Sequence, residues 1–114
     1  MHEYALTKNI VGIVNAAAAG HGAKRVNAVA LVIGENRSII PDSVQLYFDM
    51  IAKGTAAEGA VLRLRVVKAE MCCSRCRKNF QRRRFSFECP DCGELGSPTD
   101  IGNEFYVDSV ELEE

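Results

Sequence analysis

Two closely spaced pairs of cysteines constrain this chain more than any other feature of its sequence. Two residues separate Cys73 from Cys76, two separate Cys89 from Cys92, and twelve residues (77–88) lie between the pairs. A two-residue spacing lets a tight turn point both sulfurs at one ion, and two such turns complete a tetrahedron of thiolates. Because protein fills all four positions, we expect a closed, structural zinc site inside a small zinc ribbon.

Other interpretations of the cysteines stay open. Cys72 could replace Cys73, but a spacing of three makes a poorer turn, and we expect Cys72 to be a spectator thiol. Iron in a rubredoxin-like electron carrier uses similar geometry, although this segment is rich in Arg and Lys and lacks an aromatic-walled core. Two disulfides or four free thiols would need no ion. All five cysteines fall within residues 72–92, however, and this clustering favours a metal over a disulfide framework.

A basic run lies inside the cysteine module and allows three interpretations. Its phenylalanines would suit single-stranded nucleic acid, its cations would offset the charge of four thiolates, and its surface would also dock an acidic protein. The chain has a formal net charge of -1, and this balance argues against a dedicated nucleic-acid protein. The basic residues are Arg75, Arg77, Lys78, Arg82, Arg83 and Arg84, interleaved with Phe80, Phe85 and Phe87.

Hydrophobic periodicity predicts the secondary structure outside this module. Residues 4–19 read as an amphipathic helix with one apolar face, closed by the glycines that flank His21. A second helix begins near Pro41, with Asp42 as its expected cap, and ends at Lys53. The expected apolar faces are Leu6, Ile10, Ile13, Val14 and Ala17 in the first helix, and Val44, Phe48 and Ile51 in the second.

Three segments read as strands: residues 26–34, 61–71 and 105–112. In residues 61–71, Leu62, Leu64 and Val66 alternate with Arg63 and Arg65, so this strand should be half-buried. The predicted fold class is α+β, with two helices packed on a small three-stranded sheet and an inserted four-cysteine zinc ribbon. The predicted boundaries are residues 1–68 and 104–114 for the α/β domain and 69–103 for the ribbon domain.

The sequence also limits the cellular setting and the type of activity. No apolar run approaches the roughly 20 residues that a bilayer requires, and the N-terminus lacks the basic segment of a secretory signal. We therefore expect a cytoplasmic protein without a membrane partner. No Ser/His/Asp set or phosphate-binding loop appears, so we expect no enzyme activity.

The N-terminus carries a second set of possible metal ligands. The Met1 amine, the His2 amide nitrogen and the His2 imidazole can close adjacent chelate rings around Ni(II) or Cu(II), with the Glu3 carboxylate beside them. A histidine at position two is common by chance, so these residues alone favour an ordinary terminus. His21, between glycines, is expected to be a loop residue.

Several short motifs together resemble one family. They are the start Met1-His2-Glu3, the segment His21-Gly-Ala-Lys-Arg-Val26, the turn Gly54-Thr-Ala-Ala-Glu-Gly59 and the ending Cys89-Pro-Asp-Cys92. In order and spacing they resemble the HypA/HybF family of hydrogenase nickel-incorporation proteins, over essentially the whole chain.

The resemblance implies a nickel metallochaperone that is not an enzyme. It implies that His2 is the essential Ni(II) ligand, with Met1 and Glu3 nearby, and that Zn(II) held by the two cysteine pairs is structural. The implied partners are a nickel-handling maturation GTPase and the [NiFe]-hydrogenase large subunit, with a secondary role in urease maturation and no nucleic acid. We expect a monomer or a weak homodimer.

Overall fold

The computed structural model describes residues 2–83 and 86–113, with only the backbone of His2, and divides the chain into two compact units. The α/β unit consists of Met1–Val32, Ile39–Arg65 and Tyr106–Glu114. The ribbon unit consists of Ile33–Ser38 and Val66–Phe105. The ribbon unit therefore combines two separate stretches of the sequence, and the shorter one is residues 33–38.

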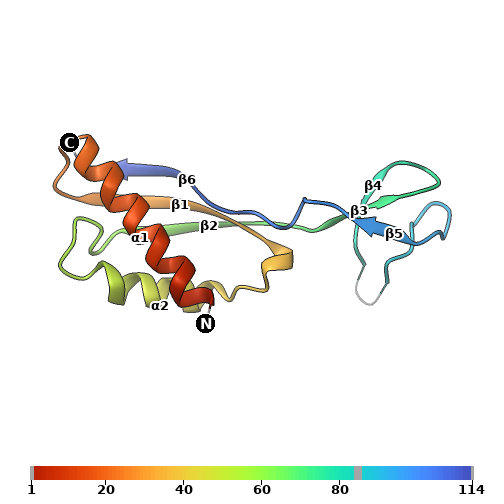
Figure 1. The fold of residues 1–114 in the computed structure, drawn as a ribbon, viewed down its shortest axis with the longest axis horizontal. Helices are drawn as coiled ribbons and strands as arrows, with labels where there is room; N and C mark the ends of the chain where they lie inside the picture. Colours follow the sequence, from red (N-terminus) through yellow and green to blue (C-terminus); the bar gives the residue numbers. More distant parts are fainter. Residues whose placement is uncertain (1, 84–85, 114) are drawn as a thin grey trace. The chain divides into compact units, whose positions relative to one another are not determined.

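The α/β unit contains two helices and a three-stranded mixed sheet, as the sequence predicts (Figure 1). The helices are α1 (His2–Gly20) and α2 (Pro41–Ala52), which pack against each other. The strands, in the sheet order β2-β1-β6, are β2 (Val61–Val67), β1 (Val26–Gly34) and β6 (Phe105–Leu112). Figure 1 shows β2 running parallel to β1 and β6 running antiparallel to it. The central strand β1 is buried along most of its length, as expected for a strand with a neighbour on each side.

The buried face of α1 differs from the predicted one at Ile13, which is 53% exposed. The face of α1 that packs inward instead includes Thr7 and Val11. Each of them lies three or four positions from the next buried residue, which is the spacing of one helical face. Ala17 is only half-buried. An apolar residue at position 13 can be fitted to either of two overlapping helical faces, and packing selects one of them. The buried residues of α1 are Thr7, Ile10, Val11, Val14 and Ala18.

The start of α2 also departs from the prediction, because Asp42 does not cap the helix. The N-cap residue is Ile40, whose carbonyl oxygen accepts hydrogen bonds from the amides of Ser43 and Val44. Pro41 occupies the first helical turn, where its fixed φ suits the helix and its missing N–H costs nothing. Asp42 thus lies inside the first turn, where its negative charge favours the positive end of the helix dipole.

The predicted strand over residues 61–71 is broken in two. Strand β2 ends at Val67, and β3 (Glu70–Cys73) begins after two residues outside either strand. The amide of Ala69 leaves the ladder to donate a 2.8 Å hydrogen bond to the Glu35 carboxylate. Val66, expected to point inward, is 54% exposed. The predicted alternation therefore holds over residues 61–65 and already fails at Val66, within β2 and before the break.

The ribbon unit holds its own three-stranded antiparallel sheet, in the order β4-β3-β5. Strand β3 is central: Met71 faces Phe80 of β4 (Asn79–Gln81) and Pro98 of β5 (Gly96–Pro98). At the base of the unit a 3-10 helix, η1 (Glu35–Arg37), is tied to the turn at residues 102–104 by hydrogen bonds.

Two glycines permit this close approach at the base of the ribbon unit. A Cβ on Gly34 would lie 2.0 Å from the carbonyl oxygen of Gly102. Gly102 itself has φ of +107°, a conformation that L side chains rarely adopt, and its Cα lies beside the backbone of Ala69. The backbone segments meet here without side chains between them.

Candidate metal centre

The structure brings together the four cysteines that the pair spacing singles out. The sulfurs of Cys73, Cys76, Cys89 and Cys92 all lie within 4.8 Å of one another, and those of Cys73 and Cys92 are 3.5 Å apart. A tetrahedral Zn(II) site with bonds of about 2.3 Å has sulfurs separated by about 3.8 Å. The sulfur cluster therefore fits one tetrahedral ion, and none of the five cysteines forms a disulfide.

The first cysteine turn is fixed by backbone hydrogen bonds on both sides of Cys73. Its amide donates to the Lys78 carbonyl (3.0 Å), and its carbonyl accepts from the Arg77 amide (2.8 Å). The Cys76 amide donates to the Cys73 sulfur at 3.3 Å. Such N–H···S contacts orient the sulfur and stabilise its thiolate form.

The second turn repeats the backbone pattern of the first. The Cys89 amide donates to the Glu94 carbonyl (2.8 Å), and the Cys89 carbonyl accepts from the Gly93 amide (2.9 Å). Gly93 has a φ of 80°, and Arg77, at the same place in the first turn, has a φ of 58°. The first turn therefore holds a non-glycine residue in a left-handed conformation, at a cost that glycine does not bear.

Both turns hold their leading cysteine inside the protein. Cys73, at the end of β3, is fully buried and Cys89 is nearly so, while Cys76 and Cys92 are half-buried. An ion held by these sulfurs would be enclosed by four protein ligands. Such a site is structural, since it has no ligand position left for water or a substrate.

The arrangement of the thiols shifts their protonation. The hydrogen bond from the Cys76 amide lowers the pKa of Cys73 to about 7. The hydrogen bond with the Cys92 sulfur, together with burial and the charge of Cys73, raises the pKa of Cys76 to about 12. The Glu94 amide acts to lower the pKa of Cys92, but burial and the neighbouring sulfurs outweigh it and the pKa is raised. Sulfurs this close cannot all be anionic unless a cation lies among them, so the group is built for a metal ion.

Cys72 lies next to the cluster in sequence and is not one of its four members. Its backbone pairs with Asn79 and Ser97 in the ribbon sheet, and its sulfur lies 3.9 Å from the carbonyl oxygen of Cys73. Adjacent residues of a strand point to opposite faces of the sheet. This alternation separates the Cys72 sulfur from the Cys73 sulfur.

The N-terminal residues are only partly described. Met1 and the side chain of His2 lie outside the described residues, whereas the backbone of His2 begins α1. Glu3 is half-buried, and its Oε2 is buried without a hydrogen-bond partner among the residues that the structure describes. The Glu3 carbonyl oxygen accepts a 2.6 Å hydrogen bond from the buried hydroxyl of Thr7. Thr7 supports the first turn of α1 from within the core, and a Thr on a helical face is too common to have indicated this from sequence.

The second histidine is far from the first. His21 is exposed just beyond Gly20, the last residue of α1. A helix rises about 1.5 Å per residue, so the nineteen residues of α1 separate the two histidines by about 28 Å. The two histidines of one chain therefore cannot bind the same ion.

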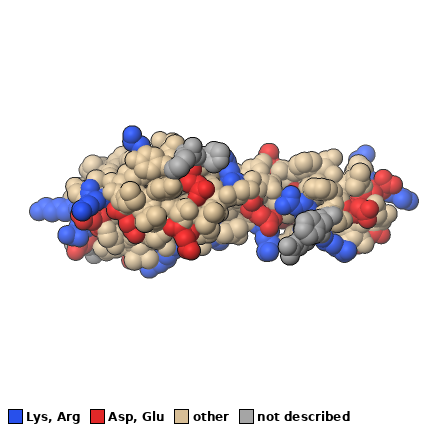
Figure 2. Space-filling view, turned by 90° about the horizontal axis from the view of Figure 1, so that it is seen from below, with Lys and Arg blue, Asp and Glu red and all other residues tan. Residues whose placement is uncertain are grey.

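The described side chains of the basic run are exposed on the surface of the ribbon unit, and Figure 2 shows side chains of both charges there. Arg84 and Phe85 lie outside the described residues. Among the residues that are described, the one ion pair is that of Arg63 with Glu111 in the α/β unit, at 3.3 Å. The Arg82 guanidinium lies 5.8 Å from the centroid of the Phe87 ring, as in a cation–π contact. No helix in the described part of the chain is long and apolar enough to cross a membrane.

Comparison with known proteins shows which protein family this chain matches. The family profile described as "Hydrogenase/urease nickel incorporation, metallochaperone, hypA" matches residues 1–112. A "Hydrogenase maturation factor HypA" from Caldanaerobacter subterraneus subsp. tengcongensis is 40% identical over 114 residues, covering 99% of this chain and 100% of the relative.

Two solved structures share the fold. One, described as "Solution structure of HypA protein", has a TM-score of 0.73 at 22% identity and covers 99% of this chain and 97% of its own. The other, the "Ni metallochaperone HypA from Helicobacter pylori", has a TM-score of 0.65 at 21% identity and covers 96% of each chain.

Proposed function

This chain belongs to the HypA family of nickel metallochaperones, and we propose that it binds Ni(II) at its N-terminus. It is a hydrogenase maturation factor and not an enzyme, so nickel is its cargo. The proposed ligands are the Met1 amine, the amide nitrogen and imidazole of His2, and the Glu3 carboxylate. Nitrogen donors in adjacent chelate rings suit Ni(II).

The first turn of α1 supplies the observation that supports this site best. The amides of a first helical turn have no partner inside the helix, so the His2 amide nitrogen is available to a metal. The Glu3 Oε2 is already buried without a hydrogen-bond partner among the described residues, so a ligated cation would satisfy it. The positive end of the helix dipole opposes a bound cation. This opposition suits a protein that has to release its nickel.

Calorimetric titration of Ni(II) into tag-free, zinc-loaded protein tests this site. We expect one nickel ion per chain in the native protein and loss of that binding in His2→Ala. His21→Ala is the matched control, because it removes the other histidine from the far end of the same helix. Equal nickel binding by the native protein and His2→Ala would remove His2 from the mechanism. Loss of binding in His21→Ala would also count against the proposed ligand set.

We also propose that the four-cysteine cluster holds Zn(II) and that the metal is structural. Its closed, tetrahedral arrangement of sulfurs supports this assignment over a catalytic metal. Iron would fit similar geometry, and visible absorbance distinguishes the two because zinc thiolate sites are colourless. Elemental analysis of freshly purified protein should give one zinc per chain. In this proposal residues 1–68 and 104–114 bind nickel and residues 69–103 bind zinc.

The proposed recipient is the [NiFe]-hydrogenase large subunit, reached in the cytoplasm together with a nickel-handling maturation GTPase. The matched family profile names urease beside hydrogenase, which supports a secondary role in urease maturation. Pull-down of the zinc- and nickel-loaded protein with the purified large subunit and GTPase tests these partners. Sedimentation of the same protein would separate a monomer from a weak homodimer.

A further inference from the structure

Basic and acidic residues are segregated along the sequence of residues 75–104. Nickel binding does not require this segregation. Every charged residue from position 75 to position 84 is basic, and every charged residue from position 85 to position 104 is acidic. The basic residues are Arg75, Arg77, Lys78, Arg82, Arg83 and Arg84, and the acidic ones are Glu88, Asp91, Glu94, Asp100 and Glu104. The first cysteine turn is therefore basic and the second acidic, although the two share one backbone pattern.

The described cations of this run are not neutralised within the protein. All five side chains from Arg75 to Arg83 are exposed, and none lies within ion-pair distance of a carboxylate among the described residues. A bound metal with four thiolates carries a formal charge of about -2, which offsets fewer cations than this run provides. Exposed charges that remain unpaired in this way favour association with a surface of opposite sign.

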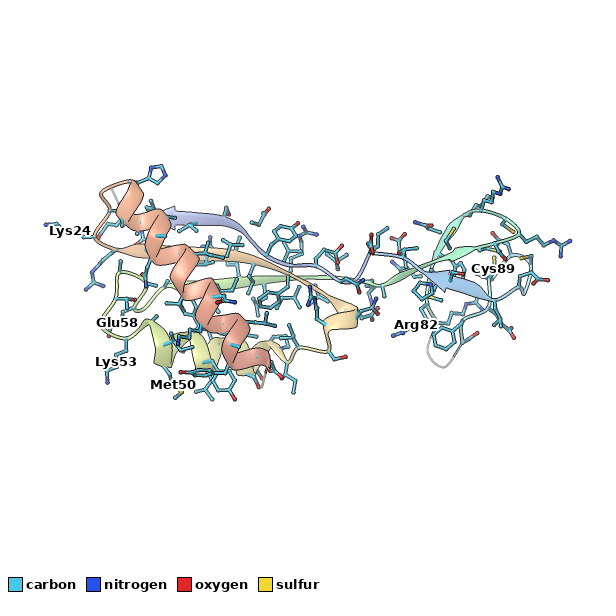
Figure 3. All side chains as sticks on the ribbon, viewed as in Figure 1. Lys24, Met50, Lys53, Glu58, Arg82 and Cys89 are labelled. Carbon is cyan, nitrogen blue, oxygen red and sulfur yellow. The ribbon has the colours of Figure 1, made fainter. Side chains whose placement is uncertain are left out.

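An exposed aromatic ring borders the basic run. Phe87 is 50% exposed. The carbonyl oxygen of Phe87 accepts a hydrogen bond from the amide of Gly96, and Glu88 forms a β-bridge with Leu95, so the Phe87 side chain points to the face opposite Leu95. Arg82, labelled in Figure 3, has its guanidinium 5.8 Å from the Phe87 ring. A cation and an exposed aromatic ring are thereby held together at one place.

We propose that this basic surface of the ribbon unit binds an acidic segment of a partner protein, with an apolar side chain of that segment against Phe87. The surface is defined by Arg82, Arg83 and Phe87. Nucleic acid is a poorer fit because a phosphate backbone crossing the ribbon unit would meet the acidic second turn. A protein segment can place its carboxylates on the basic side alone. This assignment does not depend on where nickel binds.

Fluorescence anisotropy with defined probes tests the surface on the full-length, zinc-loaded protein. The probe is a labelled twelve-residue peptide of glutamates with one central phenylalanine, beside the same peptide with glutamines and a single-stranded RNA of equal length. We expect the glutamate peptide to bind and to weaken as salt rises, because exposed charges are screened. Arg82→Glu/Arg83→Glu should weaken it by about tenfold or more, and Phe87→Ala by about threefold.

The matched control is Lys24→Glu/Arg25→Glu, which makes the same change of charge at exposed positions of the α/β unit. It should leave the peptide affinity within about twofold of the native value. Zinc content is measured for every variant. If Arg82→Glu/Arg83→Glu loses zinc, Arg82→Gln/Arg83→Gln is used in its place.

Three results would overturn the proposal. They are equal binding of the glutamine peptide, tighter binding of the RNA, and an unchanged affinity in both arginine variants. If those variants also released zinc, the cations would only offset the charge of the cluster. Self-association of the native protein that Arg82→Gln/Arg83→Gln abolishes, without any peptide binding, would assign the surface to a second copy of the chain.

Discussion

The α/β unit buries large apolar side chains, whereas the ribbon unit buries few. Phe48, Leu31 and Val14 are almost completely buried in the α/β unit. Among the described residues from 66 to 105, the buried hydrophobic side chains are those of Ala69, Met71, Cys73 and Cys89. A segment with so little apolar burial cannot offset the entropy of ordering its chain, so we expect its fold to depend on an ion held by the four cysteines. The α/β unit depends on hydrophobic burial in the ordinary way.

Removing the ribbon's metal should have the largest effect. Chelation, or Cys73→Ser, removes a binding free energy of about 10 kcal/mol or more that also folds the unit. We expect amides of β3, β4 and β5 to lose protection from hydrogen exchange while those of β1 keep it. Cys72→Ser is the control, since its sulfur is not part of the cluster, and should retain both metal and protection. Protected ribbon amides in metal-free protein would show that the ribbon unit folds without an ion.

Truncating the core of the α/β unit should produce the reverse pattern. Phe48→Ala empties a fully buried site and should lower the free energy of unfolding of that unit by about 3–5 kcal/mol. Urea titration followed by circular dichroism measures the change, and the zinc content should remain at the native level. Leu46→Ala, on the same helix but 58% exposed, should change stability by less than about 0.5 kcal/mol. Loss of zinc in Phe48→Ala would show that the two units do not fold separately.

Adding one methyl group at the base of the ribbon unit should have a smaller effect. In Gly34→Ala the new Cβ would lie 2.0 Å from the Gly102 carbonyl oxygen. The atoms nearest to this Cβ all belong to the backbone, which moves only at a cost. We expect a loss of about 1–3 kcal/mol in stability, measured by thermal unfolding. Gly12→Ala, at an exposed position of α1 with nothing within 4 Å, should instead stabilise by about 0.5–1 kcal/mol. A neutral Gly34→Ala would mean that the base of the ribbon unit is looser than its backbone contacts indicate.

Lowering the pH should affect the ribbon's metal in graded steps. Metal binding requires thiolates, so each thiol that is protonated in the metal-free protein must release its proton. The pKa of Cys76 is raised to about 12, so this thiol is protonated at pH 7 and its proton is displaced throughout the neutral range. The pKa of Cys73 is about 7, so this thiol is ionised above pH 7 and protonated below it.

Metal affinity should therefore fall with falling pH, by about tenfold per pH unit for each displaced proton, and the slope should steepen by one proton below about pH 7. Competition with a colorimetric chelator between pH 6 and 8 measures this dependence. A slope that stays constant across pH 7 would contradict the lowered pKa of Cys73.

The sequence predicted regular elements well where the apolar pattern is long and uninterrupted. Strands over residues 26–34 and 105–112 have the predicted bounds, and α1 extends the predicted helix by two residues at its start and by one at its end. The fold class follows from these elements, since two helices and three strands leave few ways to cover one sheet. The clustering of four cysteines follows from their spacing alone.

Features that depend on contacts between distant residues could not be predicted. The break after Val67 occurs because the Ala69 amide bonds Glu35, a partner 34 positions away. Residues 33–38 join the ribbon unit through the glycine contact of Gly34 and Gly102. Ile13 is exposed because the tertiary packing of α1 chooses between two apolar faces that the sequence leaves equivalent. Local pattern contains no information about any of these contacts.

Strand β6 lies next to β1 in the sheet but follows the whole ribbon unit along the chain. During synthesis, which proceeds from the N-terminus, β1 therefore emerges with one edge open, and that edge is closed only after residues 68–104 have been made. An unpaired apolar strand invites pairing with other chains. We expect nascent chains stalled within the ribbon to aggregate through β1. The order of translation thus makes the α/β unit wait for the ribbon unit, although its own helices and two of its strands are made first.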